Sequence, residues 1–159
     1  MHDQKLIADY LRKCFVSVDG LWFMKVEEDA DFEKALALDI QVWKVLPKIE
    51  ARTIQELLKL GSGMEALRQA LEFKLSAEDS RFKLSPLSPD GLTLEVHDCS
   101  WVAHIRKANR EKFLERISES ICSLEYCTFA GDFGADITVA HDRDRCREGC
   151  CSFRFHESR

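Results

Sequence analysis

The chain lacks the features that would place it in a membrane, on a secretory route or on nucleic acid. Its N-terminal stretch, MHDQKLIADY, has no apolar signal-peptide core, and no apolar run approaches membrane-spanning length. Basic residues number 23 against 28 acidic ones, so the formal net charge is −5. General polyanion binding needs a basic footprint. We therefore expect a cytoplasmic protein that binds neither membranes nor nucleic acid.

Internal repeats, low-complexity segments and a recognisable catalytic motif are also missing. The chain of 159 residues is nevertheless long enough to bury a core without disulfides, and 45% of its residues are hydrophobic. Length and composition thus predict a single globular domain over residues 1–159.

The first half, residues 1–75, is predicted to be mainly helical. Apolar side chains recur at helical spacing from Leu6 to Val18. Asp31 is a plausible N-cap for the next helix, and Pro47 is expected to kink or restart it. A shorter helix is expected around residues 64–73.

The second half, residues 80–159, predicts two β-hairpins with helix between them. Four short segments alternate polar and apolar residues, and turn-forming or charged residues join them in pairs. The predicted fold class is therefore α+β, with an N-terminal helical layer packed on a small antiparallel sheet of two hairpins separated by a helix. The strand segments are 82–84 with 92–96 and 137–139 with 151–155, and the helical segments are 100 to about 119 and 121–133.

Cysteine is abundant, with seven residues in all and six of them between Cys99 and Cys151. Thiolates oxidise and capture metals, so such clustering indicates a disulfide framework, a metal site, a reactive thiol or a thiol-lined pocket. A reducing cytoplasm and the odd number of cysteines disfavour disulfides. The other three interpretations remain open.

Cys99 is the first candidate for a reactive thiol. It follows the strand that contains Val96, at the point where a helix begins. Free backbone N–H groups at a helix N-terminus stabilise a thiolate and would lower the pKa of Cys99. His97 and His104 are near enough in sequence to supply a base or a proton donor. Alternatively, Cys99 is a small buried apolar residue.

Cys122, Glu125 and Tyr126 share one face of a predicted helix through their i, i+3 and i+4 spacing. Such a face can present a thiolate, a carboxylate and a phenol to one pocket. The alternative has Cys122 and Tyr126 in the core and Glu125 capping the helix or solvated. Cys127 points elsewhere and is interpreted as structural.

A metal site is predicted from the cysteines of separate elements. Cys146 precedes Cys150 and Cys151 at spacings that let two sulfurs reach one ion, although neither spacing is the tight C-x-x-C knuckle. Adjacent strand residues face opposite sides, so only one of the final pair can join the others. The predicted ligands are Cys99, Cys122, Cys146 and Cys151, a set that suits zinc or an iron–sulfur cluster.

Several stretches resemble a known family. They are VDGLWFMKVEE and FEKALALDIQVWKVLPKIEARTIQELL in the first half, and CSWVAHIRKANREKFLERISESICSLEYCTFAGDFGADI with RCREGCCSFRF in the second. These are similar to a family of small cytosolic proteins of anaerobic bacteria and archaea that is placed beside L-2-amino-thiazoline-4-carboxylic acid hydrolase. The end of the chain also resembles the 4-vinyl reductase-type small-molecule-binding domain, in which a cysteine, a glycine and a second cysteine precede the last strand.

The resemblance implies a ligand pocket between helices and a small antiparallel sheet, with cysteines at its mouth. A hydrolase of the thiazoline type would use Cys99 or a metal-bound water as nucleophile, and Glu125 or a histidine as base. Arg110 would hold the substrate carboxylate. The residues expected to line the ligand site are Tyr126, Trp101 and His104, and Cys122 is a further catalytic candidate.

Three functional classes follow from these features. The first is a protein with a cysteine-lined pocket that binds a metal or a small molecule, the second is the hydrolase, and the third is an interaction protein with purely structural cysteines. Clustering of the cysteines favours the first two, and the lack of a catalytic motif favours the first. The expected partner is a small-molecule ligand, and further copies of the chain stay open as partners.

Overall fold

The computed structural model describes residues 3–144, 146–148 and 150–158. The chain forms two compact units, Met1–Val42 and Trp43–Arg159. Among the described residues, no helix combines the length and the hydropathy needed to cross a membrane.

The first unit is formed by α1 (Gln4–Asp29) and most of α2 (Phe32–Trp43). The predicted N-cap of α2 is confirmed, because the carboxylate of Asp31 accepts a hydrogen bond from the backbone N–H of Lys34 at 2.7 Å. The aromatic rings of Phe23 and Phe32 lie 5.7 Å apart, on the two helices. Both helices fall within the region predicted from helical periodicity.

The second unit opens with α3 (Leu46–Leu58) and α4 (Met64–Ala77). Pro47 lies in the first turn of α3, where its missing N–H removes no hydrogen bond, so it restarts the helix as predicted. Lys59 ends α3 in the left-handed conformation, with φ of 55°. Helix α4 extends four residues beyond the predicted end because Lys74 and Leu75 are buried in the core.

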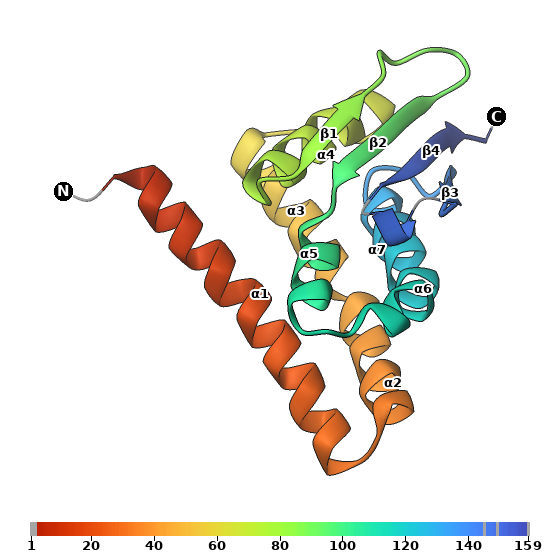
Figure 1. Cartoon of the computed structure of the whole chain (residues 1–159). Helices are drawn as coiled ribbons and strands as arrows, with labels where there is room; N and C mark the ends of the chain where they lie inside the picture. The colour runs from red at the N-terminus through yellow and green to blue at the C-terminus, as the bar shows by residue number, and fades with distance from the viewer. Residues whose placement is uncertain (1–2, 145, 149, 159) are drawn as a thin grey trace. The chain divides into compact units, whose positions relative to one another are not determined.

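One antiparallel sheet of four strands completes this unit (Figure 1). Both predicted hairpins are confirmed, and pairing of their inner strands joins them into a single sheet in the order β1-β2-β4-β3. The protein therefore has the predicted α+β fold. The strands are β1 (Arg81–Leu84), β2 (Leu92–Asp98), β3 (Ile137–Asp142) and β4 (Cys151–Glu157).

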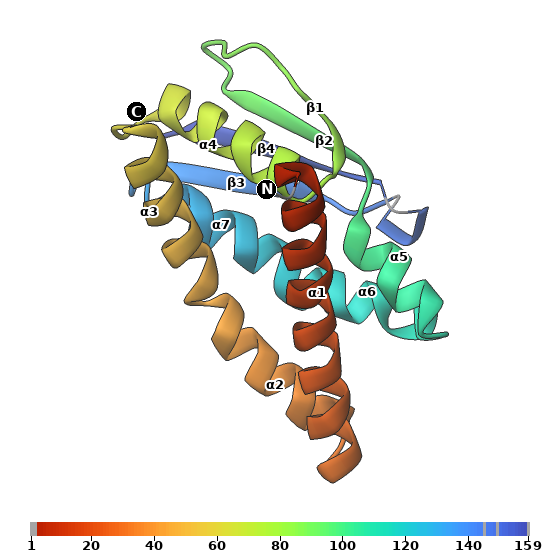
Figure 2. The ribbon, with the colours of Figure 1, turned by 90° about the vertical axis from the view of Figure 1, so that its left-hand side faces the viewer.

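Helices cover one face of the sheet, as Figure 2 shows for α4 and α7 (Ser123–Gly131). Helix α4 contacts β1, α7 contacts β3, and α3 contacts both helices. Successive strand side chains point to opposite faces, so Phe153 and Phe155 are fully buried while Arg154, between them, is exposed. The inward positions of β3 and β4 are therefore the ones that can contribute to a buried site.

The helical segment between the hairpins is more broken than predicted (Figure 1). The prediction of one helix from residue 100 to about residue 119 is wrong, because α5 ends at Lys107 and Asn109 adopts a left-handed conformation with φ of 56°. Asparagine tolerates this conformation better than most residues, so it can stop a helix without glycine. The elements are α5 (Ser100–Lys107), a 3₁₀ turn (Glu111–Phe113), α6 (Leu114–Ile117), a π-helical turn η2 (Ser118–Cys122) and α7.

Gly91, in the turn of the first hairpin, cannot be replaced without strain. Its φ is 101°, and a Cβ there would lie 2.0 Å from the backbone carbonyl oxygen of Phe155. We expect Gly91→Ala to lower the free energy of unfolding by about 2 kcal/mol. Gly131→Ala is the matched control, because a Cβ at that helical position meets nothing within 4 Å. Urea unfolding of the two variants measures the difference, and equal stabilities would contradict it.

Candidate functional site

Three strands have an end at the same end of the sheet, where β2 and β3 stop and β4 begins. Antiparallel pairing places Val96, near the end of β2, opposite Cys151, the first residue of β4. Asp142, the last residue of β3, pairs with Ser152. Cys99 follows β2 directly as the N-cap of α5. The topology of the sheet, rather than any short motif, therefore brings Cys99 and Cys151 to the same end of the sheet.

Cys99, Cys122 and Cys151 form what we call the thiol cluster. All three pack against the hydrophobic core, and each residue is partly exposed to solvent. Burial raises the pKa of Cys122 well above its usual value, and charges on Glu125, Cys99 and Cys151 raise it further. Charge on Cys99 also raises the pKa of Cys151, so charge–charge interactions among these thiols oppose their ionisation.

The pKa of Cys99 is raised, whereas the sequence predicted that it would be lowered. Burial raises it to about 11, and the backbone N–H groups of Val102 and Trp101 at the start of α5 only partly oppose this shift. Cys99 is the N-cap as predicted, but the expected lowering of its pKa is wrong, because desolvation outweighs the helix terminus. Burial likewise raises the pKa of Cys151 to about 12. These thiols are therefore protonated at neutral pH.

A buried ion network lies beside the thiol cluster. The ammonium of Lys74 on α4, which is only 4% exposed, contacts carboxylates of Glu50 at 2.9 Å, Glu125 at 3.1 Å and Glu78. Burial lowers the pKa of Lys74, but the three carboxylates outweigh this effect and hold it well above the usual value. One cation thus joins α3, α4 and α7.

Glu125 links this network to the cysteines. Burial raises its pKa to about 7, with the Lys74 ammonium opposing the shift. Its charge in turn raises the pKa of each member of the thiol cluster. Glu125 can therefore take up a proton near neutral pH.

Cys146 and the final cysteine pair line two surface pockets that share Asp142 and Asp144. Cys146 belongs to a pocket of about 470 Å³, whereas Cys150 and Cys151 belong to one of about 410 Å³. The charge of Cys146 contributes to the raised pKa of Cys99 and of Cys151, so its sulfur lies near the thiol cluster.

Cys150 and Cys151 lie in different surroundings. Cys151 packs against the hydrophobic core with Cys99 and Cys122, whereas the thiol of Cys150 donates to the backbone carbonyl of His97 at 3.3 Å. The charges of Cys99, Cys146 and Cys150 all contribute to the raised pKa of Cys151. Within the ranges that the structure describes, no three His, Cys, Asp or Glu side chains are grouped closely enough to hold a metal ion as they stand.

His141 is a site residue that the sequence analysis missed. Its ring stacks on Phe153 at 4.1 Å, and its Nδ1 is hydrogen-bonded to the hydroxyl of Ser123 at 2.9 Å. Burial lowers the pKa of His141 to about 4, so the imidazole is neutral. Its Nε2 is buried with no hydrogen-bond partner. The signal in the sequence is a histidine at an inward position of β3, after Ile137 and Val139.

Two predicted ligand-site residues lie in aromatic contacts. Tyr126 is buried, with its ring 3.9 Å from that of Phe153, and burial raises its pKa well above 10. Trp101 meets Trp43 edge-on at 5.9 Å. Tyr126 thus lies next to Glu125 in the core, and the Trp101 ring packs on Trp43, the first residue of the second unit.

The other two predicted residues lie on or after α5. His104 is exposed, and its Nδ1 is hydrogen-bonded to the carbonyl of Ser100 at 2.7 Å. Arg110 places its guanidinium 4.8 Å from the centre of the Phe113 ring. Their roles as ligand contact and carboxylate clamp stay predictions.

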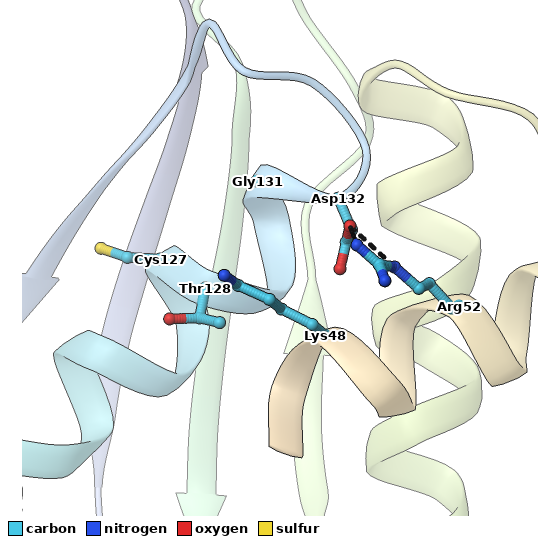
Figure 3. A pocket seen from close by; sticks show the side chains of 6 residues that line it. All are labelled: Lys48, Arg52, Cys127, Thr128, Gly131 and Asp132. Atoms are coloured by element: carbon cyan, nitrogen blue, oxygen red, sulfur yellow. Dashed lines mark hydrogen bonds and ion pairs between the residues drawn. The ribbon is translucent and has the colours of Figure 1, made fainter. Parts of the chain in front are cut away.

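A third pocket, of about 450 Å³, lies between α3 and α7 (Figure 3). Arg52 binds the carboxylate of Asp132 at 3.1 Å there, and Lys48 extends its ammonium toward Thr128. The sulfur of Cys127 points away from these groups (Figure 3). Cys127 is exposed, in agreement with the prediction that it points away from the other cysteines.

Comparison with known proteins gives one match. Neither the curated proteins nor the solved structures include a significant match to the chain. The sequence profile of a family of unknown function, DUF6125, matches residues 2–155. Because the match spans almost the whole chain, the protein belongs to the DUF6125 family.

Proposed function

We propose that the protein binds a thiolate-preferring metal ion, zinc above all, at the thiol cluster in a reducing cytoplasm. Cys99, Cys122 and Cys151 would supply three ligands and Cys146 the fourth. The observation that carries the proposal is that Cys99, Cys122 and Cys151 come from separate elements and pack against the same hydrophobic core, where the charges of Cys99 and Cys151 raise the pKa of Cys122.

The high pKa values of the three thiols favour a site in which they ionise only when a cation is bound. Ionising three neighbouring thiols in a partly buried site is unfavourable, because each charge opposes the next. A bound divalent cation reverses this effect, since a coordinating thiol is deprotonated by the metal. Tetrahedral thiolate sets select zinc or an iron–sulfur cluster. Because the ligands are not yet grouped around one point, binding would require their side chains to rotate toward the ion.

Elemental analysis and metal titration test this proposal. Protein purified without oxygen should contain zinc at close to one equivalent, or show the visible absorption of an iron–sulfur cluster. After removal of metal with a chelator, titration with Co²⁺ should produce a thiolate-to-metal charge-transfer band, and Zn²⁺ should displace the Co²⁺.

Matched cysteine variants locate the site. We expect Cys122→Ser to weaken zinc binding at least about 100-fold, whereas Cys127→Ser, on the same helix but exposed, should leave it unchanged. Metal-free protein that does not bind Co²⁺ would refute the metal site and favour structural cysteines. Equal affinity in the Cys122 and Cys127 variants would refute its placement.

Hydrolysis of a thiazoline carboxylate is a second candidate function, supported by Glu125. A carboxylate with a pKa of about 7 beside Cys99 can accept the proton that the thiol loses when it attacks a C=N carbon. The thiol itself is not activated in the resting protein, so direct metal binding is better supported. Incubation of the anaerobic protein with L-2-amino-thiazoline-4-carboxylate and assay for released thiol decides between the two.

A further inference from the structure

We propose that the 470 Å³ pocket beside the end of β3 binds a small organic cation that also carries a hydrogen-bonding group. This pocket, here called the His141 pocket, lies between α6, η2 and the connection from β3 to β4. Helix α6 contacts the short 3₁₀ turn Cys146–Glu148, which closes its far side. The proposal does not require a bound metal, although Cys146 of this pocket is also the proposed fourth metal ligand.

Two buried polar atoms without partners belong to residues that line the His141 pocket. They are the hydroxyl oxygen of Ser118, a residue only 3% exposed, and Nε2 of His141. The Ser118 side chain lowers the pKa of Cys122 and so favours the Cys122 thiolate. No group, however, lies within hydrogen-bond geometry of the Ser118 hydroxyl oxygen. Leaving a buried polar atom unpaired costs about 1–3 kcal/mol. Two such atoms in one pocket indicate a polar ligand group that pairs with both.

Ser118 and His141 are each held by a distinct local structure. Ser118 opens the π-helical turn η2, and single π turns inside helices occur frequently at functional sites. The hydrogen bond from Ser123 to Nδ1 fixes the His141 ring and leaves Nε2 as its free nitrogen, whichever tautomer is present. The imidazole is therefore oriented before any ligand arrives.

The charge of the lining selects a cation. Carboxylates of Glu115, Glu119, Asp142 and Asp144 line the pocket, and Arg143 supplies the guanidinium among its described lining residues, 3.5 Å from Glu119. In the sequence of segment 142–148, acidic and basic residues are equal in number, so their formal charges cancel. Glu115 and Glu119 therefore add net negative charge at this pocket.

The pocket suits an organic cation better than a metal ion. A volume of about 470 Å³ lies in the range of small-molecule sites and far exceeds that of one ion. An ammonium group would meet the carboxylates, and an adjacent hydroxyl or amide would pair with Ser118 and His141.

Cys146 provides a chemical probe of this pocket, because its thiol lines it. Its thiolate attacks one sulfur of a symmetric disulfide, the disulfide bond breaks, and the leaving thiolate takes up the proton that Cys146 lost. The products are a mixed disulfide and one free small thiol, so Cys146 is oxidised and the reagent reduced. Chelator-treated protein is used, so failure of this test leaves the metal proposal untouched.

Reaction rates with three disulfides of different charge test the cation preference. We expect cystamine, which is cationic, to modify Cys146 about tenfold faster than neutral 2-hydroxyethyl disulfide at low salt, and anionic dithiodipropionate to be the slowest. Rates at each cysteine are followed by peptide mass spectrometry. Modification of the exposed Cys127 by the same three reagents gives a reference rate order at a thiol outside the His141 pocket.

Charge-neutralising variants link the preference to the named carboxylates. The double variant Glu119→Gln with Asp144→Asn should reduce the tenfold ratio to about twofold, and Glu56→Gln, an exposed residue of α3, should leave it unchanged. Equal ratios in all three proteins, or a preference for the anionic reagent, would overturn the proposal.

Protection of Cys146 tests the hydrogen-bonding pair. Ethanolamine should slow alkylation of Cys146 by iodoacetamide at millimolar concentration, as expected for a ligand of so few atoms, and ethylamine, which lacks the hydroxyl, should protect about fivefold less. Ser118→Ala should abolish this difference while retaining the protection by ethylamine. Circular dichroism confirms that the variant is folded, and an unchanged difference in folded Ser118→Ala would refute the role of the hydroxyl.

Discussion

Lys74→Met should destabilise the protein by about 3–5 kcal/mol, because it leaves the buried carboxylate of Glu125 and the partly exposed carboxylates of Glu50 and Glu78 without their cation. The Lys74 ammonium is the group that Glu50, Glu78 and Glu125 all contact, and its side chain is 4% exposed. Methionine keeps the length and apolar stem of lysine, so the loss reports the missing charge rather than a cavity. Urea unfolding near pH 7 measures it.

A second substitution distinguishes charge from packing. Adding Glu125→Gln to Lys74→Met removes one of the stranded carboxylates and should recover part of the lost stability. Lys48→Met, at an exposed position of α3, should change the stability by no more than about 0.5 kcal/mol. If Lys74→Met costs less than about 1 kcal/mol, the three carboxylates are not held by this cation.

The fold was predictable because its elements follow clear periodicities and local signals. Alternation around Val96 and Phe153 marks strands whose inward side chains are buried, and Asp31 and Pro47 mark helix starts by their own chemistry. The break after Lys107 was not predictable from periodicity, since the apolar stripe continues through it. A left-handed Asn109 ends the helix there without changing the pattern of apolar residues.

The site was predictable only where it depends on element boundaries. Cys99 and Cys151 stand at a strand end and a strand start, so antiparallel pairing brings them together. Lys74 reads in sequence as an ordinary basic residue of a helix, and its burial depends on Glu50 and Glu125 from α3 and α7. Desolvation of Cys99 is likewise a tertiary effect, which is why its pKa rises where a helix N-terminus alone would lower it.

Glu125→Gln should change the pH dependence of stability by about 3 kcal/mol. Burial raises the pKa of Glu125 from 4.5 to about 7, so the folded state binds this proton more tightly than the unfolded state. The stabilisation from protonated Glu125 is therefore complete below about pH 4.5 and is lost as the pH rises to about 7. Glutamine stays neutral throughout, so the variant should gain stability relative to the native protein over this range.

Parallel urea unfolding of the native protein and Glu125→Gln at several pH values from about 5 to 8 measures this difference, and other carboxylates cancel because both proteins share them. Glu56→Gln, an exposed residue of α3, should give a flat difference over the same range. A Glu125 difference that is also flat would mean that Lys74 offsets the burial of this carboxylate completely. Glu125 would then be ionised at neutral pH and would not accept the proton of a neighbouring thiol.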